Sequence, residues 1–491
     1  MSRTARALSL AAAGVVFALL ATANAGGYRY GTSDQAFYIP VVAHALDPSL
    51  FPRDGSVIDA EGRLMVLDEV LAALAASTGL SLEVLFLGGY LLSLALIWSA
   101  LVLIGTRVSG STWAVAALAA AFALRHRIPR TSANSFEPYF HPRMLAFGLG
   151  ALAVAAVLRR RGWTAVALVA GAALVHVTTA LWFAVLVGVA LATLDIRWRR
   201  LAALAAAGAA VTLTLAVAAG PLRDTLRVMD AAWLQAVASK DSLFATAWPA
   251  WAWLANVGLL GLLWWAHRTR VRRGEAAPED RALVWGATAL VALFVVTLPL
   301  VAAGLSLAVQ FQVSRVFWLV DFMALVYVVA ALSRGPVRRY GAAAALALVA
   351  LAASRGAYVM LVEHPERALF EVRFVESPWQ DAMRWMAGRP RDVHVLADPG
   401  HAWKYGTSVR VSAGRDVLLE EVKDSALAIY SRDVALRVVD RATAVGDFTS
   451  LTADRARALA QQYGLDFLVT EADLPLPAAY VNEQFRIYAL R

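Results

Sequence analysis

The sequence contains no cysteine, few charged residues and hardly any lysine. Without cysteine, the chain can form no disulfide, no thiolate metal site and no cysteine nucleophile. Charged residues make up 16% of its 491 residues, against about a quarter in soluble domains. Lysine occurs only at Lys240, Lys404 and Lys423, so arginine carries almost all of the positive charge. These absences exclude cysteine chemistry and argue against an ordinary soluble protein.

Apolar residues account for 60% of the chain, and they gather in long runs. A membrane-spanning helix needs about 20 mostly apolar residues, and several runs approach or exceed this length. The sequence therefore predicts a polytopic α-helical membrane protein. The charge-poor runs lie at residues 7–25, 80–105, 111–125, 143–158, 163–194, 201–220, 249–266, 283–303, 314–333 and 338–356.

The run at 163–194 is too long for one span. As a single helix it would measure about 48 Å, against a hydrocarbon core of about 30 Å. Arginine clusters precede it at 159–161 and follow it at 197–200. Because short cytoplasmic loops are rich in arginine, both clusters belong on one side, and the chain must cross out and back between them. We expect two short helices with a break near His176, and about eleven transmembrane helices in all.

The arginines also predict the orientation. The short basic connections fall on one side if the N-terminus is cytoplasmic. They lie at 107, 159–161, 197–200, 268–273 and 334–339. The connections outside the cytoplasm are then 26–79, 126–142, 221–248 and 304–313, followed by the C-terminal region. This placement accounts for the net charge of +9, which does not indicate a nucleic acid as partner.

The first apolar run has two interpretations. Arg3 and Arg6 precede it, and the Ala-Asn-Ala sequence at 23–25 resembles a signal-peptidase site. The run is either a cleaved signal peptide or an uncleaved first span, and the many later spans favour the second. In both cases the following loop lies outside the cytoplasm. We expect the protein in the inner (plasma) membrane of a bacterium.

The chain changes character near residue 363, where charges become frequent. Alternating apolar patterns predict strands at 392–397, 465–470 and 484–490. Helical patterns cover 378–387, 431–442 and 453–463, and amphipathic helices are predicted at 64–76 and 227–239. We expect a membrane domain at 1–358 with an outer loop at 26–79, and a soluble α/β domain at 359–491. This domain has no GxGxxG and no P-loop, so no chemistry is assigned to it.

Asp34, in the outer loop, is the candidate catalytic residue. One interpretation is a helix cap, because Thr32, Ser33 and Asp34 suit a helix that opens at Gln35, and Gln35 would complete a capping box with Thr32. The other is a carboxylate at the membrane face that takes a proton from an attacking hydroxyl. The pattern leaves both interpretations open.

Two further aspartates, Asp47 and Asp54, lie in the same loop. Pro48 follows the first and Gly55 the second, which is typical of turns. Either carboxylate also has the chemistry of a second acid or of a ligand for a divalent metal beside Asp34. Aspartates this far apart are a weak metal pattern, so no cofactor is assigned.

Basic residues crowd the loop between the spans at 111–125 and 143–158, on the side where arginine is disfavoured. They either contact membrane lipid headgroups from the helix ends or bind a phosphate. Guanidinium groups bind phosphate bidentately and neutralise a departing phosphate. Glu137, in the same loop, is an alternative partner for an arginine. The candidate substrate-binding residues here are Arg125, Arg127, Arg130, His141 and Arg143.

Three residues in or near the spans complete the candidate substrate-binding set. Asp321 is an acid inside a predicted span, which indicates either a functional site or a structural pair with a basic residue of another helix. His176 lies at the predicted break, either as a ligand or bonded to a backbone carbonyl. Arg315 lies in the outer turn where the span at 314–333 begins, and there it can meet a phosphate or a sugar.

Together these features resemble the GT-C superfamily, integral membrane glycosyltransferases that use polyprenyl-phosphate-linked sugars. The matching pieces are Ser33-Asp34-Gln35 after the first span, the surface helix at 64–78, the span beginning His141-Pro142-Arg143-Met144-Leu145, the short helices around Val175-His176-Val177, and the opening Ser377-Pro378-Trp379-Gln380-Asp381 of the C-terminal domain.

The resemblance implies transfer of one sugar from a polyprenyl phosphate to an extracytoplasmic acceptor glycan, lipid or protein. It implies Asp34 as the base, and Arg130, Arg143 and Arg315 as contacts of the lipid phosphate. The chain departs from the family pattern because Gln35, and not a second acid, follows Asp34. Metal dependence, and activity itself, are therefore left open.

Two other functions fit the same architecture. A transporter or flippase of lipid-linked sugars predicts inverted repeats and broken helices, of which the sequence indicates only the break at His176. A non-catalytic membrane scaffold would use its C-terminal domain to bind another envelope protein. Metalloprotease, hydrolase and ATPase functions have no support, because HExxH, GxSxG and Walker motifs are absent.

Overall fold

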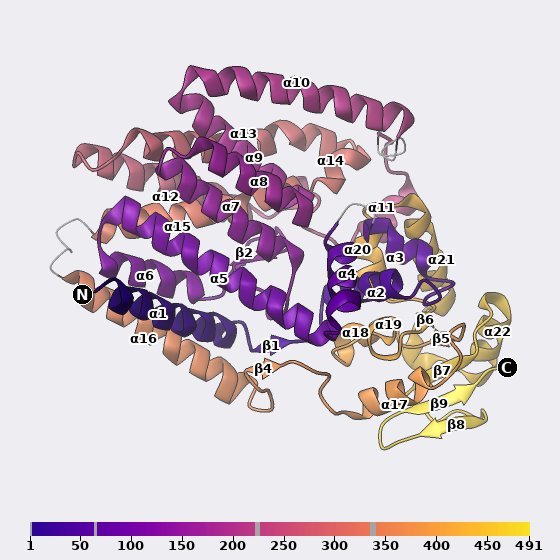
Figure 1. The fold of residues 1–491 in the computed structure, drawn as a ribbon. Helices are drawn as coiled ribbons and strands as arrows, with labels where there is room; N and C mark the ends of the chain where they lie inside the picture. The colour runs from indigo at the N-terminus through magenta and orange to yellow at the C-terminus, as the bar shows by residue number, and fades with distance from the viewer. Residues whose placement is uncertain (1, 63–65, 221–225, 334–339) are drawn as a thin grey trace. The chain divides into compact units, whose positions relative to one another are not determined.

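Helices dominate the computed structural model of the chain (Figure 1). It describes residues 2–62, 66–220, 226–333 and 340–491. Several sequence predictions involve residues outside these ranges. They include the basic connection at 334–339, the start of the span at 338–356 and part of the outer connection at 221–248. They also include part of the outer loop at 26–79, with the start of the amphipathic helix at 64–76.

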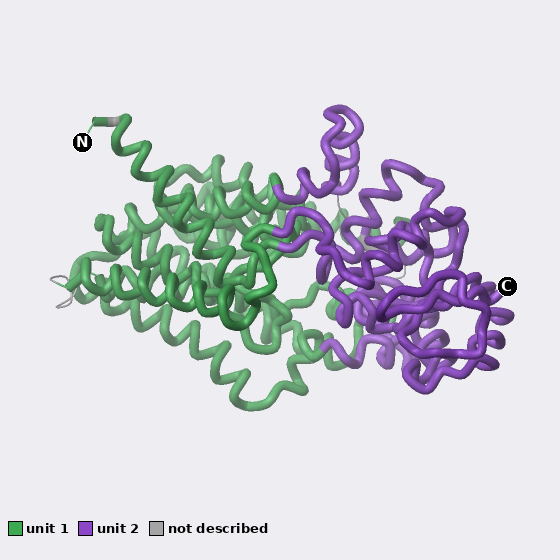
Figure 2. Tube along the Cα trace, turned by 90° about the horizontal axis from the view of Figure 1, so that it is seen from below, with its two compact units in different colours: residues 1–28, 88–228, 241–370 green, residues 29–87, 229–240, 371–491 purple. Residues whose placement is uncertain are grey.

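The chain forms two compact units, and neither is one continuous stretch of sequence (Figure 2). The helical unit consists of residues 1–28, 88–228 and 241–370, and the mixed unit of residues 29–87, 229–240 and 371–491. Residues 29–87 thus share a unit with the C-terminal region, although most of the chain separates them in sequence. The division of the chain into a membrane domain at 1–358 and an outer domain at 359–491 stays a prediction.

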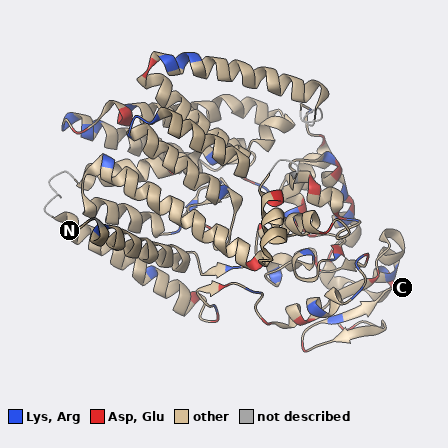
Figure 3. Ribbon diagram, viewed as in Figure 1, with Lys and Arg blue, Asp and Glu red and all other residues tan. Residues whose placement is uncertain are grey.

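The helical unit is built from apolar helices, many of them long. In chain order they are α1 (Arg3–Asn24), α5 (Leu82–Ser109), α6 (Thr112–Ala123), α7 (Pro142–Leu158), α8 (Gly162–Val175), α9 (Val177–Leu194), α10 (Ile196–Ala219), α12 (Ala250–Arg272), α13 (Pro278–Ala302), α14 (Ser306–Gln310), α15 (Val316–Ser333) and α16 (Gly341–Tyr358). A hairpin of β2 (Arg127–Ile128) and β3 (Ala133–Asn134) joins α6 to α7. Figure 3 shows the charged residues of this unit mostly near the ends of its helices.

Seven helices of the described chain have the length and composition of a membrane span. They cover Thr4–Asn24, Leu82–Ser109, Val177–Leu194, Ile196–Ala219, Pro278–Ala302, Ser306–Ser333 and Gly341–Glu363. The helices α6, α7 and α8 are apolar but shorter. The chain is therefore a polytopic helical membrane protein, whereas the count of eleven spans stays a prediction. The break near His176 is confirmed, because α8 ends at Val175 and α9 begins at Val177.

Aromatic rings fill the core of the helical unit. Phe147 of α7 stacks on Trp318 of α15 with ring centroids 4.3 Å apart. The ring of Phe183, on α9, meets the same phenylalanine edge to face at 5.5 Å. Each such pair adds about 0.5–1.5 kcal/mol to the effect of burial. These contacts hold together the three helices whose N-terminal ends carry the candidate site.

A five-stranded sheet forms the centre of the mixed unit, in the order β6-β5-β7-β9-β8. Its strands are β5 (His394–Leu396), β6 (Asp416–Val417), β7 (Phe467–Thr470), β8 (Ala478–Val481) and β9 (Arg486–Ala489). β5 pairs in parallel with β6 and β7, whereas β9 runs antiparallel to β7 and β8. The strands predicted at 392–397, 465–470 and 484–490 are confirmed as β5, β7 and β9.

Helices cover both faces of this sheet. On one face Val395 packs with Trp379 of α17 (Pro378–Ala387), and on the other Leu396 packs with Leu459 of α22 (Ala453–Tyr463). This follows from the alternation of side chains along a strand. The other helices are α2 (Gln35–Leu46), α3 (Gly55–Gly62), α4 (Leu67–Thr78), α11 (Ala231–Val237), α18 (His401–Lys404), α19 (Val409–Ala413), α20 (Glu421–Leu427) and α21 (Arg432–Val445). The predicted helices at 378–387, 431–442 and 453–463 are confirmed.

Candidate functional site

Two helix N-termini of the helical unit meet at a pair of histidines. His141 caps α7, where its Nδ1 accepts a hydrogen bond from the N–H of Arg143 at 3.2 Å. His176 caps α9 in the same way, accepting from the N–H of Thr179 at 3.2 Å. The two imidazole rings lie 6.2 Å apart, edge to face. A neutral imidazole that accepts at Nδ1 carries its proton on Nε2.

Positive charge surrounds the two histidines. Arg143 lies in the first turn of α7 and is 3% exposed. Arg315 ends a short 3₁₀ turn that leads into α15. His141, Arg143 and Arg315 are all electrostatic neighbours of the ring of His176. The structure thus brings four of the predicted substrate-binding residues into one region, and the partial positive charges of two helix N-termini add to it. Such a region suits an anion.

Glu137 fixes the guanidinium of Arg143. Its carboxylate forms an ion pair with Arg143 and lies 3.7 Å from Nη2 of Arg125. Asn134 donates to both oxygens of Glu137 at 3.1 Å, and Arg143 donates to the carbonyl oxygen of Ser132 at 3.2 Å. The acid therefore pairs with the arginines of its own loop, which was one alternative in the sequence. Its charge offsets part of the positive charge of the region.

The other predicted residues of the basic loop have separate partners. Nε2 of His126 lies 2.8 Å from Oδ2 of Asp321. Burial opposes the charged imidazole, but the hydrogen bond and charge of Asp321 outweigh burial and raise the pKa of His126 above its usual value. Asp321 thus forms a pair with a histidine of another segment. Arg130 forms an ion pair with Asp241, and Arg127 is exposed in the β2–β3 hairpin.

Asp34, the candidate base, lies in the mixed unit directly before α2. Its Oδ1 is 2.7 Å from Nζ of Lys423, a lysine that is 7% exposed. Lys240 is close to both, since their charges act on it. Burial, and next the repulsion of Lys423, lower the pKa of Lys240 to about 8. Two of the three lysines in the sequence therefore gather beside Asp34.

The capping interpretation of Asp34 is wrong. Asp34 occupies the N-cap position of α2, but its side chain makes no capping hydrogen bond. A capping residue has an extended backbone, whereas Asp34 has helical angles of φ −68° and ψ −13°. The side chain of Gln35 reaches one residue further back than a capping box requires, because its Oε1 accepts from the N–H of Gly31 at 2.7 Å.

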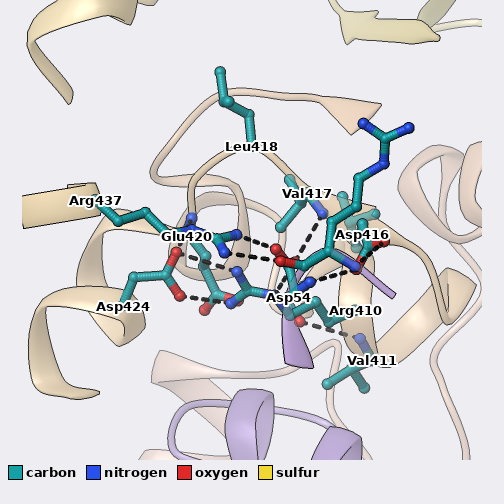
Figure 4. A network of polar contacts seen from close by, with 12 residues as sticks. Asp54, Arg410, Val411, Asp416, Val417, Leu418, Glu420, Asp424 and Arg437 are labelled. Atoms are coloured by element: carbon teal, nitrogen blue, oxygen red, sulfur yellow. Dashed lines mark hydrogen bonds and ion pairs between the residues drawn. The ribbon is translucent and has the colours of Figure 1, made fainter. Parts of the chain in front are cut away.

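Asp54 stands at the centre of a buried ionic network that the sequence did not reveal (Figure 4). It is fully buried and pairs with Arg410 at 2.7 Å and with Arg437. Arg410 also pairs with Asp424 at 2.6 Å. Burial opposes the charge of Asp54, but the two guanidinium groups outweigh burial and hold the pKa of that carboxyl well below its usual range. The turn interpretation fits its backbone but missed these partners.

Asp47 is confirmed as a turn residue. Its Oδ1 accepts a hydrogen bond from the N–H of Ser49 at 3.1 Å, and its Oδ2 pairs with Arg391. Within the described ranges, no group of three or more His, Asp or Glu residues is arranged to hold a metal ion.

The fold and these clusters define a class: an integral membrane protein with many helices, a cationic region at the ends of three of them, and a mixed α/β unit. No protein-family model matches the chain, and no curated protein matches it. Among solved structures, the chain is similar to the oligosaccharyltransferase of Archaeoglobus fulgidus in its apo form. The two share 12% identity and a TM-score of 0.34, over 94% of this chain and 69% of the other. Similarity this low carries no conclusion about activity.

Proposed function

We propose that the chain is a membrane glycosyltransferase that moves a sugar from a polyprenyl-phosphate donor to an acceptor outside the cytoplasm. The observation that carries the proposal is the meeting of two histidine-capped helix N-termini beside Arg143 and Arg315. The resemblance of the sequence to the GT-C superfamily supports it. We also propose a cytoplasmic N-terminus, an outer C-terminal domain and a location in the bacterial plasma membrane.

The cationic region suits the phosphate of a lipid-linked donor. It lies at the N-terminal ends of apolar helices, where a span leaves the hydrocarbon and meets polar headgroups. Backbone N–H groups at a helix start point toward an anion, and guanidinium groups bind phosphate oxygens in pairs. The ring N–H of His176 adds a donor from the same place. A prenyl chain could then lie along the apolar helices while its phosphate is held at their ends.

The chemistry is one displacement. An acceptor hydroxyl attacks the anomeric carbon while the bond from that carbon to the phosphate oxygen breaks. The bonding pair leaves with the phosphate, so negative charge grows on the phosphate in the transition state. Cationic groups that are already in place stabilise this growing charge more than they stabilise the bound donor. A single displacement inverts the configuration of the anomeric carbon.

We assign to Asp34 the role of the base that takes the hydroxyl proton, because an ionised carboxylate is a suitable acceptor. The ion pair with Lys423 orients this carboxylate. The preceding residue, Ser33, has φ +54°, a strained conformation of the kind that clusters at functional sites. Asp34 and the cationic region belong to different units, so the role of Asp34 rests on its chemistry and on the resemblance of its segment.

Transfer of a radiolabelled sugar by the purified full-length chain tests the proposal. Asp34→Asn should lower kcat by at least about 100-fold, because a general base contributes about 10²–10⁴. Arg315→Gln should instead raise the KM for the donor at least about tenfold, because a hydrogen bond to a charged group contributes about 1.5–3 kcal/mol. Asp47→Asn and Arg197→Gln remove the same charges elsewhere and should leave both constants near those of the unmodified chain.

Unchanged turnover in Asp34→Asn would rule out its role as the base. If the unmodified chain carries a lipid-linked sugar across vesicle membranes without transferring the sugar to an acceptor, the flippase hypothesis replaces the glycosyltransferase hypothesis. If it does neither, the remaining alternative is a scaffold, and the full-length chain should then retain a partner from the cell envelope.

A further inference from the structure

A cavity of about 610 Å³ opens within the mixed unit. Cavities of about 300–1,000 Å³ hold small organic ligands. Four helices line it: α2, α3, α4 and α21. None of the residues assigned above to sugar transfer lines it. Its ionisable lining residues are His44, Asp59, Asp68, Glu69, Asp433 and Arg437.

Asp68 points to a ligand. It lies in the first turn of α4, lines the cavity and is 8% exposed. Its Oδ1 has no hydrogen-bond partner within the described part of the chain. A buried carboxylate oxygen that gives up water without gaining a donor is unfavourable. A donor group that enters the cavity would supply this missing hydrogen bond.

The charge of the lining is negative. Glu69 and Asp433 are exposed and add two carboxylates to that of Asp68. The guanidinium of Arg437, the one arginine among the described lining residues, is engaged by the carboxylate of Asp54 and the carbonyl oxygen of Arg53. Its charge is therefore matched outside the cavity.

Nδ1 of His44 lies 2.9 Å from the carbonyl oxygen of Leu50. Its N–H is therefore used by the backbone and is not offered to the carboxylates of the cavity. Carboxylates accept hydrogen bonds, and an ammonium group offers three donors and no acceptor. Since the described residues include no group of acids and histidines arranged for a metal ion, an organic cation fits the cavity better than a bare one.

We propose that this cavity binds a ligand that carries a protonated amine, with the ammonium group seated on Asp68 and Glu69. The ligand class is an amino sugar or a linear polyamine, since the volume admits either. Binding is a property of the mixed unit and does not depend on sugar transfer, so this proposal and the proposed function stand or fall separately.

The protonation state of Asp68 gives ligand binding a second measurable property, the release of protons. Burial, and next the hydrogen bond and charge of Glu69, raise the pKa of Asp68 to about 7. The other elements that line the cavity contribute the titratable groups of Asp59, Asp433, Arg437 and His44. An ammonium group favours the ionised carboxylate, so binding near neutral pH should release protons.

Titration calorimetry of the full-length chain tests the proposal with glucosamine, spermidine and N-acetylglucosamine, the last being the neutral counterpart of the first. At least one amine should bind, and its apparent heat should change with the ionisation enthalpy of the buffer, which reports proton release. Asp68→Asn should weaken binding at least tenfold. Asp454→Asn, which removes an exposed carboxylate of α22, should leave binding unchanged.

Binding of glucosamine alone identifies the ligand as an amino sugar, and binding of spermidine alone as a polyamine; both results support the proposal. Should Asp68→Asn not fold, Glu69→Gln keeps the test valid, because Glu69 is exposed and its loss should also weaken binding. The proposal is overturned if no amine binds, if N-acetylglucosamine binds as well as glucosamine, if calcium binds in preference to both amines, or if neither variant weakens binding.

Discussion

Glu420 is a fully buried acid whose protonation should affect the stability of the mixed unit. Burial raises the pKa of Glu420 to about 8, and the attraction of Arg410, whose Nη1 is 3.9 Å away, opposes this only in part. The pKa of an unfolded glutamate is about 4.3. Because the folded pKa is the higher one, the contribution to stability is complete below about pH 4.3 and is lost as the pH rises toward 8.

Glu420→Gln should remove much of this pH dependence, because a neutral amide resembles the protonated acid. Hydrogen exchange, corrected for intrinsic rates, measures the protection of the backbone amides of β5 and β7. In the unmodified chain we expect this protection to fall from pH 5 to pH 8. At pH 8 the variant should be at least about tenfold better protected, since one pKa unit corresponds to about 1.36 kcal/mol. Asp454→Asn is the matched control, and profiles that run parallel would contradict the prediction.

Asp54 affects the pH dependence of stability in the opposite direction to Glu420. Its pKa is lowered in the folded state, so its contribution is present above the unfolded value of about 3.9 and is lost as the pH falls through the folded value. No local pattern could have identified this residue, because its partner Arg410 lies 356 positions away. Sequence patterns relate residues that are close together in the sequence, and at Asp54 they predicted only a turn. The same limit applies to the ion pair of Asp34 with Lys423.

At the scale of the element, sequence patterns predicted the helix bounds correctly where a helix is amphipathic and has a capping residue. Ser377 caps α17 and Thr452 caps α22, and the predicted bounds of both helices match the structure. The break at His176 followed from length and charge. The strands β6 and β8 were missed, because β6 has two residues and the burial of β8 does not alternate. Periodicity cannot reveal such strands.

The histidine caps give a prediction about α9 that separates structure from binding. His176→Ala should lower the free energy of unfolding by about 0.5–2 kcal/mol, because the N–H of Thr179 loses its acceptor. His176→Asn should keep the cap, since asparagine is among the best capping residues. Both variants lack the imidazole N–H, so both should weaken donor binding.

Thermal unfolding and the donor KM, measured on the same preparations, test this prediction. Ser377→Ala removes a cap in the mixed unit, where Ser377 accepts from the N–H of Gln380 at 3.2 Å, and should lower stability without changing the KM. Should His176→Asn bind the donor as the unmodified chain does, His176 serves only as a cap.

At the scale of the whole molecule, the mixed unit is assembled from three separate segments of the chain. Residues 363–491 alone lack α2, α3, α4 and Asp54, and so leave Arg410 and Arg437 without one partner. Removing one partner of a buried ion pair typically destabilises by about 3–5 kcal/mol. We therefore expect residues 363–491 alone to show no cooperative thermal unfolding by circular dichroism.

Joining residues 29–87 and 229–240 to this fragment through flexible linkers should restore a cooperative transition. The same fusion with Asp54→Asn should unfold at a lower temperature. A cooperative transition in residues 363–491 alone, at the temperature of the fusion, would contradict the prediction.

The network around Asp54 also has a consequence for the order of synthesis. The ribosome synthesises the chain from its N-terminus, so Asp54 is incorporated 356 residues earlier than Arg410. At about 5 to 20 residues per second, this interval lasts about 20 to 70 s. During it the acid has no guanidinium partner, and the early segments of the mixed unit cannot close around it. A chain released before Arg410 has been added keeps this acid uncompensated, so the network distinguishes finished chains from unfinished ones.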